Sequence, residues 1–213
     1  MFITLEGPEG SGKTSQLSQF AEFLRKLGYE VVTTREPGGT SIGDQIRQVL
    51  VSMENKKLHP RTEILLFLSA RAQLVEELIK PSLENGKIVV CDRYGDSTLA
   101  YQGYGHGLPL EPLREMLRFA TGGLVPDLTL YLDIEVEKGL LRKKRGKEWN
   151  RLDAYEVEFH RRVRNGYLAL AVEEPQRWCV IDANQPKQEV QLAMRIATLA
   201  VINKLESHSV SLR

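Results

Sequence analysis

A glycine-rich stretch near the amino terminus carries the strongest chemical signal in the sequence. The residues "GPEGSGKT" (7–14) fit the pattern G-x-x-x-x-G-K-[ST] in full, between an apolar segment and a helical pattern. In this pattern the backbone wraps phosphate groups, the lysine reaches the terminal phosphates and the hydroxyl group binds Mg²⁺. We therefore expect a purine nucleoside triphosphate such as ATP, with Mg²⁺, to be held by Gly7, Pro8, Glu9, Gly10, Ser11, Gly12, Lys13 and Thr14.

A carboxylate that could complete the metal site lies at the end of another apolar segment. Asp92 ends "KIVVCD" (87–92), and metal sites of this kind need a carboxylate at the end of a neighbouring strand. The same aspartate could instead cap a helix. We predict that Thr14 and Asp92 are the metal ligands. GTPase switches, motor-type ATPases and small-molecule kinases share this loop, so it does not by itself name a reaction.

A second chemical signal is a concentration of positive charge. The stretch "RKKRGKEWNR" (142–151) has six basic side chains, although the whole chain has 29 Lys and Arg against 28 Asp and Glu. The near-neutral balance argues against a general nucleic-acid or membrane-surface partner. Phosphoryl transfer requires cations around the transferred group, which favours a local role for the stretch. A solvated charge run or a nucleic-acid patch is the alternative.

Alternating strand-like and helical segments must position these groups. Apolar segments rich in β-branched residues occur at 2–6, 30–34, 87–92, 128–133 and 178–182. Helical periodicity predicts helices at Thr14–Leu27, Ile42–Val51, Thr62–Glu84, Leu110–Ala120, Ala154–Glu173 and Lys187–Leu205. This alternation predicts an α/β fold: a doubly wound parallel five-stranded sheet with helices on both faces. Ligands of such folds bind at the carboxyl ends of the strands.

Length and composition set further expectations. The 213 residues contain no repeat or linker, so we expect one domain over 1–213. No apolar run approaches the roughly 20 residues that span a bilayer, and no export signal is visible, which predicts a cytoplasmic protein. Cys91 and Cys179 lie in apolar segments without metal-ligating partners, so we expect both to be small buried side chains.

Three further stretches, together with the glycine-rich loop, carry a resemblance to a known family. "REPGGT" (35–40), "FLSAR" (67–71) and "DRYGDSTLAYQG" (92–103) follow in the order and spacing of the thymidylate kinases. The resemblance implies a P-loop nucleoside monophosphate kinase fold and transfer of the γ-phosphoryl group of ATP to dTMP, giving dTDP for dTTP synthesis. It also implies a homodimer.

The resemblance assigns roles around the acceptor nucleotide. Arg93 would grip the acceptor phosphate, Phe67 would stack on thymine and Arg71 would bond the edge of the base. From the sequence alone, Phe67 would be taken as a core residue. Glu9 would lie near the sugar and phosphate, and Tyr101 would exclude a 2′-hydroxyl group. The remaining acceptor residues would be Ser97, Thr98, Gln102 and Arg35. Arg35 could instead pair with the charge of Glu36 or with an outer helix.

The resemblance also explains the basic stretch as a lid over the phosphates at about 142–152. Arg145 and Arg151 match the lid arginines best, and Arg142 is a lesser candidate. The predicted catalytic set is Lys13, Arg93, Glu9, Arg145 and Arg151. The stretch "IDANQP" (181–186) would lie along adenine.

Two alternatives stay open. Another nucleoside or deoxynucleoside monophosphate kinase could share the loop and the lid, but it would need a different base pocket. A non-catalytic nucleotide-dependent regulator could bind RNA through the lid, with an affinity that falls steeply in salt.

Overall fold

Five parallel strands form the centre of the computed structural model, which describes residues 1–146 and 149–211, without the side chains of 206 and 208–211. The strands are β1 (Phe2–Glu6), β2 (Val31–Arg35), β3 (Ile88–Asp92), β4 (Leu128–Asp133) and β5 (Trp178–Asp182). Their order in the sheet is β2-β3-β1-β4-β5, and every pairing is parallel. The predicted fold class is confirmed.

The register brings polar residues to one edge of the sheet. Leu5 pairs with Asp92 in β3, so Glu6 emerges beside the end of that strand. Glu6 is also level with Tyr131 in β4, two residues before Asp133. Since parallel strands end at the same edge, carboxylates from three strands gather where the loop after β1 begins.

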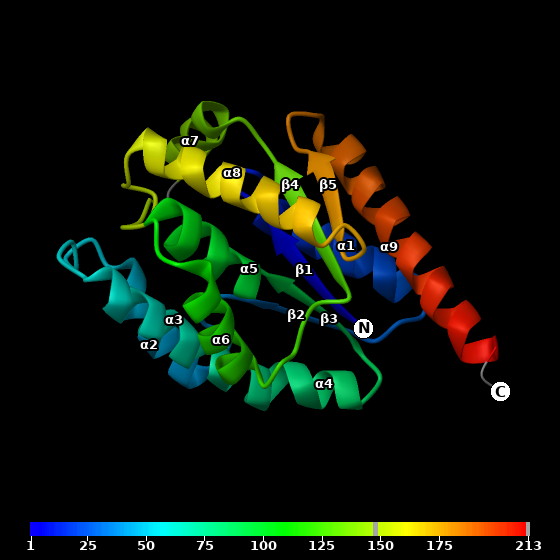
Figure 1. Ribbon diagram of the computed structural model, residues 1–213. Helices are drawn as coiled ribbons and strands as arrows, with labels where there is room; N and C mark the ends of the chain where they lie inside the picture. The colour runs from blue at the N-terminus through cyan, green and yellow to red at the C-terminus, as the bar shows by residue number, and fades with distance from the viewer. Residues whose placement is uncertain (147–148, 212–213) are drawn as a thin grey trace.

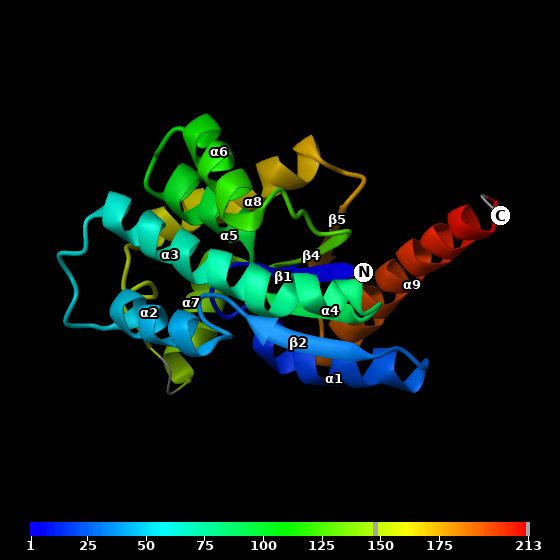
Figure 2. The same cartoon turned by 90° about the horizontal axis from the view of Figure 1, so that it is seen from below.

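Helices cover both faces of the sheet. On one face, α1 (Lys13–Lys26) and α9 (Lys187–Ser211) pack against Ile3 and Leu5 of β1. Phe2 points to the opposite face because side chains alternate along a strand. That face carries α3 (Pro60–Leu74), α4 (Lys80–Glu84), α6 (Leu110–Thr121) and α8 (Val157–Glu173). Figure 1 shows the arrangement, and Figure 2 shows α1 and α6 on opposite sides of the sheet.

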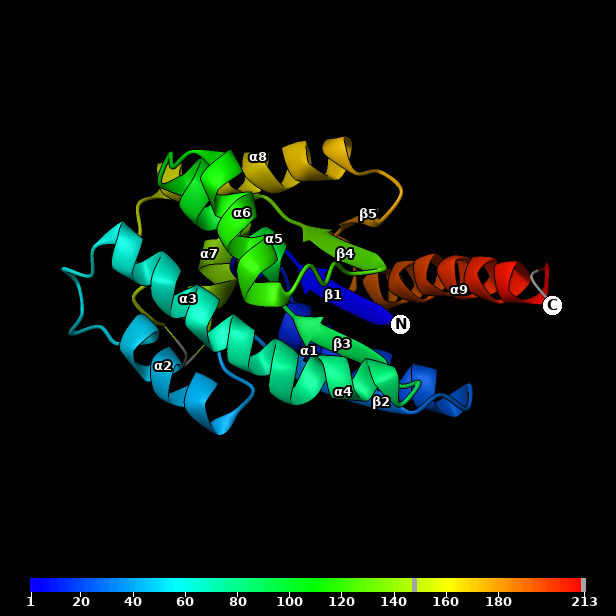
Figure 3. The ribbon, with the colours of Figure 1, turned by 60° about the horizontal axis from the view of Figure 1, so that its bottom comes forward.

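The predicted helices agree with the structure apart from their ends. The expected helix at 62–84 is one helical run, in which π-helical geometry at Val75–Ile79 joins α3 to α4. Helix α2 (Ser41–Val51) begins after Thr40, whose hydroxyl accepts a hydrogen bond from the Gly43 N–H. Helix α9 runs to Ser211, beyond its predicted end, and its second half projects away from the sheet (Figure 3).

Two helical regions lie outside the predicted ranges. Helix α5 (Gly95–Thr98) continues into a π-helical segment, Leu99–Gly105, and α7 (Val136–Arg145) follows β4. The first is short and rich in glycine, so it has no clear apolar period. Among the described residues, no helix is long and apolar enough to cross a bilayer. Cys91 is buried as expected, and Cys179 is partly buried.

Candidate active site

The loop between β1 and α1 has the geometry of a phosphate cradle. Gly10 and Gly12 have φ angles of 71° and 95°, a region that side chains disfavour. The ammonium group of Lys13 lies inside the loop and donates to the carbonyl oxygens of Gly7 at 2.8 Å and Pro8 at 3.0 Å. It also donates to Ser11 Oγ at 3.2 Å. The loop therefore encloses a cation at the amino terminus of α1.

Burial disfavours the charged form of Lys13, and a bound anion would stabilise that form. Its side chain is buried, and burial lowers its pKa to about 8, with a further contribution from the charge of Arg93. Its bonds are to neutral carbonyl and hydroxyl oxygens. Phosphate oxygens are stronger acceptors for this ammonium group.

The predicted metal ligands are direct neighbours. Thr14 Oγ1 donates to Asp92 Oδ2 at 2.8 Å, across the gap between α1 and the end of β3. Both are hard oxygen donors of the type that Mg²⁺ prefers, and Mg²⁺ usually takes few protein ligands besides phosphates and water. No group of three or more His, Cys, Asp or Glu in the described residues is arranged to hold a metal by itself. The pair therefore fits a Mg²⁺ ion that is shared with a bound nucleotide.

Helix α7 rests directly on the phosphate loop. A Cβ atom on Gly10 would lie 1.9 Å from the carbonyl oxygen of Gly139, and a Cβ on Gly139 would lie 2.3 Å from that of Glu9. Both distances are far below any real contact, so neither position has room for a side chain. The two backbones are in contact, and the basic helix begins against the loop.

Arg93 is the centre of the acceptor side. It has a φ angle of 71° and is the only residue other than glycine with positive φ among those described. Such strain is often found at functional sites. Its guanidinium donates to Glu9 Oε1 at 2.6 Å and to the hydroxyls of Tyr101 at 3.0 Å, Tyr167 at 3.1 Å and Ser97 at 3.3 Å. Four residues therefore aim one planar fork.

Glu9 occupies the fork in this state. Tyr101 donates a further hydrogen bond to Glu9 Oε1 at 2.7 Å, and the Arg93 guanidinium lies 5.0 Å from the centre of the Tyr101 ring. Burial alone would raise the pKa of Glu9, but the charges of Arg93 and Lys13 bring it down to about 2. Glu9 is thus an anion that interacts with both cations predicted to bind phosphates.

Glu6, for which no role was predicted from the sequence, binds two of the hydroxyl groups that contact Arg93. It accepts hydrogen bonds from the Tyr94 N–H at 2.7 Å, Ser97 Oγ at 2.6 Å and the Tyr167 hydroxyl at 2.9 Å. Burial raises its pKa to about 7, and the charge of Asp96 adds to the effect. A carboxylate at the end of the apolar segment "FITLE" was a usable signal for Glu6. Tyr167, which lies in α8, had none.

The predicted base-contacting residues come from α3 and from the segment after β3. Arg71 is almost fully buried and donates to both Glu36 oxygens, at 3.0 and 2.8 Å from Nε. Its other bonds go to Thr98 Oγ1 at 2.9 Å and the Tyr94 carbonyl at 3.1 Å. Phe67 is half-buried and belongs to none of the hydrophobic clusters of the described residues. The core alternative for Phe67 is therefore weakened.

Two predicted site residues are bound to other partners. Gln102 is buried, and its amide nitrogen donates to Glu63 Oε1 at 2.8 Å. Arg35 is exposed and pairs with Asp44 at 3.4 Å. The pairing that the sequence analysis left open for Arg35 is therefore present, with Asp44 as the partner.

The predicted lid lies only partly within the described residues, since 147–148 fall outside them. Arg145 is exposed at the end of α7 and has no hydrogen-bond or ion-pair partner within the described part of the chain. Arg142 donates to the Ala183 carbonyl at 3.1 Å, in the loop predicted to lie along adenine. Arg151 is 6% exposed and bound to Glu63 at 2.6 Å, so only Arg145 of the two principal lid arginines is free in this conformation.

A buried acid, Asp153, contacts the basic stretch from the chain that follows it. Asp153 accepts from the Asn150 N–H at 2.8 Å and lies 3.7 Å from the Lys143 ammonium. Burial raises its pKa to about 6, and the nearby charge of Glu9 adds to the effect. The chain after the basic stretch therefore returns to the phosphate loop.

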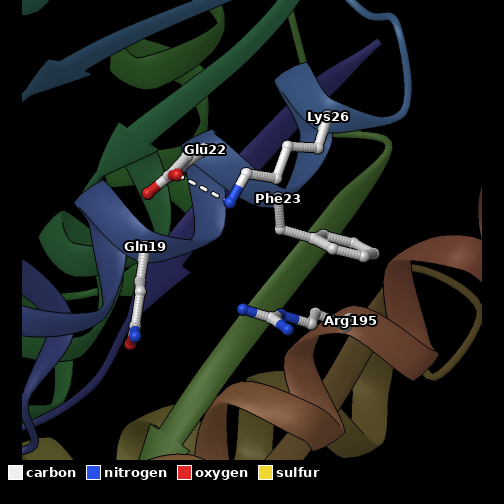
Figure 4. A pocket seen from close by; sticks show the side chains of 5 residues that line it. All are labelled: Gln19, Glu22, Phe23, Lys26 and Arg195. Carbon is white, nitrogen blue, oxygen red and sulfur yellow. Dashed lines mark ion pairs between the residues drawn. The ribbon is translucent and has the colours of Figure 1, made fainter.

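A small cavity of about 160 Å³ lies apart from these residues, between α1 and α9 (Figure 4). It is lined by Phe23, whose ring lies 4.7 Å from the Arg195 guanidinium, and by an ion pair of Glu22 and Lys26 at 2.8 Å. None of the predicted site residues borders it. We do not assign it to the active site.

Comparisons with known proteins agree with this geometry. The thymidylate kinase family pattern matches residues 5–194. The thymidylate kinase of Roseiflexus castenholzii is 51% identical over 225 residues, covering 97% of each chain, and that of Thermomicrobium roseum is 52% identical over 204 residues, covering 95% of this chain and 96% of its own. The crystal structure of thymidylate kinase from Ehrlichia chaffeensis superposes with a TM-score of 0.78 at 34% identity and covers 93% of this chain and 98% of its own. The chain therefore belongs to the thymidylate kinase family of P-loop nucleoside monophosphate kinases.

Proposed function

We propose that the protein transfers the γ-phosphoryl group of ATP to the phosphate of dTMP. The observation that carries the proposal is that two cations, Lys13 from the donor loop and Arg93 from the acceptor segment, both act on one carboxylate: Arg93 is bonded to Glu9, and the charges of both lower its pKa. In-line transfer needs the donor and acceptor phosphates next to each other, held by groups on different elements. The reaction would be direct, without a phosphoenzyme.

On the donor side, Lys13 would exchange its carbonyl partners for the β- and γ-phosphates of ATP. Thr14 and Asp92 would hold Mg²⁺, which supplies charge neutralisation on the phosphates. Arg142 and the 181–186 loop would border the adenine ring, as their contact at Ala183 suggests.

On the acceptor side, Arg93 would exchange Glu9 for the dTMP phosphate. A guanidinium fork binds a phosphate with two parallel hydrogen bonds and so fixes its direction. Ser97, Tyr101 and Tyr167 would keep the fork in place during the exchange. Glu9, released from Arg93, would lie beside the deoxyribose.

The base would lie against Phe67, with Arg71 and Thr98 at its edge. Three of the five guanidinium hydrogens of Arg71, one on each nitrogen, donate to Glu36, Thr98 and the Tyr94 carbonyl, and Nη2 is also ion-paired with Glu36. The second hydrogen of Nη1 remains for a carbonyl oxygen such as that of thymine. Ser97, Gln102 and Arg35 complete the proposed acceptor pocket.

Arg145 would supply the cation that stabilises charge on the transferred group. The variable positions of the phosphate loop contain no basic residue, so this cation must come from elsewhere. A free, exposed arginine at the end of a helix that starts on the loop can meet this need.

The test is a coupled assay of ADP formation with a panel of nucleoside monophosphates. We expect the highest kcat/KM with dTMP, and a roughly 10–200-fold lower value with dUMP, which lacks one methyl group in an apolar pocket. Phe67→Leu should narrow that ratio. Equal kcat/KM for dTMP and dUMP in the native protein would contradict the base pocket, and no turnover with salt-sensitive RNA binding would support the regulator instead.

A homodimer is also part of the proposal. Helices α3 and α6, on the same face of the sheet, expose Leu65 at 59% and Phe119 at 91%. Apolar side chains so exposed suit a subunit interface. Sedimentation of the native protein and of Phe119→Glu would test it. A cytoplasmic location and a single domain stay predictions.

A further inference from the structure

We propose that Glu63 anchors the carboxyl end of the basic segment by holding Arg151, and that Arg151 is a positioning residue without contact to the phosphates. The inference rests on the proposed function, because it concerns where the catalytic cation Arg145 is placed. It departs from the sequence-based assignment of Arg151 to catalysis.

Every guanidinium nitrogen of Arg151 donates a hydrogen bond within the protein. Nε donates to the Leu50 carbonyl at 2.9 Å, Nη1 to the Tyr155 hydroxyl at 2.9 Å, and Nη2 to Glu63 Oε2 at 2.6 Å. Its backbone N–H donates to the carbonyl of Val51 at 3.2 Å. All three guanidinium nitrogens and the backbone N–H are therefore bonded to α2, to α3 and to Tyr155, just before α8.

Glu63 receives partners on both oxygens. Oε2 accepts from Arg151 and from the Tyr155 hydroxyl at 3.2 Å. Oε1 accepts from the Gln102 amide at 2.8 Å, and His106 Nε2 lies 3.5 Å away. A carboxylate only accepts hydrogen bonds, so it fixes the amide nitrogen of Gln102 toward itself. Oε2 thus binds Arg151 of the basic segment, and Oε1 binds Gln102 of the segment after β3.

Burial makes this pair difficult to open. The Glu63 side chain is 1% exposed and that of Arg151 is 6% exposed. If Arg151 left to meet a phosphate, Glu63 would stay behind as a buried carboxylate without its cation, and such uncompensated charges are strongly unfavourable. Retaining the pair is the less costly state throughout the reaction.

The anchor completes a segment that is fixed at both ends. At its amino end, Gly139 touches the phosphate loop, and at its carboxyl end Arg151 is tied to Glu63. Arg145 lies between these points and is itself unpaired within the described residues. Two fixed ends limit where its guanidinium can reach, and a displacement of about 1 Å in such a group can cost on the order of 100-fold in rate.

Kinetics of five proteins test the proposal: native, Arg151→Met, Arg151→Lys, Glu63→Gln and the double variant Glu63→Gln/Arg151→Met. We expect Arg151→Met and Glu63→Gln each to lower kcat by about 10–100-fold, with the dissociation constant of dTMP within about 3-fold of native. Arg151→Lys retains the ion pair and should stay within about 5-fold of native kcat. The double variant should be no worse than the poorer single variant, because both changes remove one anchor.

The opposite pattern would overturn it. If Arg151 touches the phosphoryl group, Lys will be as damaging as Met, Arg151→Met will lose on the order of 1,000-fold, and Glu63→Gln will leave kcat almost unchanged. Multiplied losses in the double variant would also contradict a shared role. Turnover by the native protein in the same assay reports the proposed function separately.

Limited trypsin digestion gives a readout that does not depend on substrate. Each protein is digested at the same number of degrees below its own melting temperature. Cleavage in the run 142–145 should be about 10-fold faster in Arg151→Met and Glu63→Gln than in the native protein. Lys144→Ala, which changes an exposed residue of that run, should leave kcat at the native value. Native-like cleavage in both anchor variants would show that the ion pair does not hold the segment.

Discussion

Glu6 gives a prediction whose size follows from the structure. This carboxyl is fully buried below the acceptor cluster, and its pKa is raised to about 7 by burial and by Asp96. The perturbation is Glu6→Gln, which keeps the shape and an oxygen for the Tyr94 N–H but does not titrate. We expect it to change how stability depends on pH.

The magnitude comes from proton linkage. The folded chain binds this proton with a pKa of about 7, against 4.5 for an ordinary glutamate. At about 1.4 kcal/mol per tenfold change in proton affinity, the difference is on the order of 3 kcal/mol. The stabilisation is fully present below about pH 4.5, because the folded state holds the proton more tightly, and it is lost as the pH rises through about 7.

The assay is urea unfolding of the native protein and Glu6→Gln at several pH values between 5 and 8. The native protein should lose stability relative to the variant as the pH rises, by about 2–3 kcal/mol over this range. Glu63→Gln is the matched control. The pKa of Glu63 is held at about 2 by contacts with His106, Gln102 and Arg151, although burial opposes them, so its titration falls below this range.

A constant difference between native protein and Glu6→Gln from pH 5 to 8 would refute the reasoning. It would mean that Glu6 is charged throughout and that Arg93 compensates its burial. Unfolding of Asp153→Asn should be measured over the same pH range. The pKa of Asp153 is raised to about 6, so this carboxyl also titrates between pH 5 and 8.

Three further predictions concern the reaction. Since the pKa of Lys13 in the free protein is lowered to about 8 by burial, kcat/KM for ATP should fall as the pH rises through that value, and a flat profile to pH 9.5 would contradict it. Tyr101→Ala should admit the ribose form of the acceptor, which an unchanged ribo-to-deoxy ratio of kcat/KM would disprove. Arg145→Ala should lower kcat on the order of 1,000-fold with little change in dTMP affinity, whereas a similar loss in Lys144→Ala would indicate a general effect of charge.

The fold could largely be predicted from the sequence because its strands are continuous apolar runs. The same signal failed where helices owe their stability to tertiary contacts. Gly95–Gly105 has small and polar residues, yet it is buried between α6 and α8. Helix α7 is mostly polar, and its position depends on a close contact with the phosphate loop.

The site divides in the same way. The phosphate loop is contiguous, so its eight residues could be predicted from their spacing, whereas Asp92 was predicted from its position at the end of an apolar segment. Glu36 and Glu63 could not, because each acts through an arginine far away in sequence. The partner decides whether such an arginine is bound within the protein or free for a ligand. This is why Arg145 and Arg151 looked alike in the sequence and differ in the structure.

The contact between Gly10 and Gly139 has a consequence for how motion can spread. Side chains between two elements can change rotamer and absorb a shift, but two touching backbones have no such freedom. A displacement of the phosphate loop toward α7 would therefore push the first turn of that helix directly, with no side chain to absorb the shift. Bending is then left to the ends of that helix, at the chain after β4 and at Gly146.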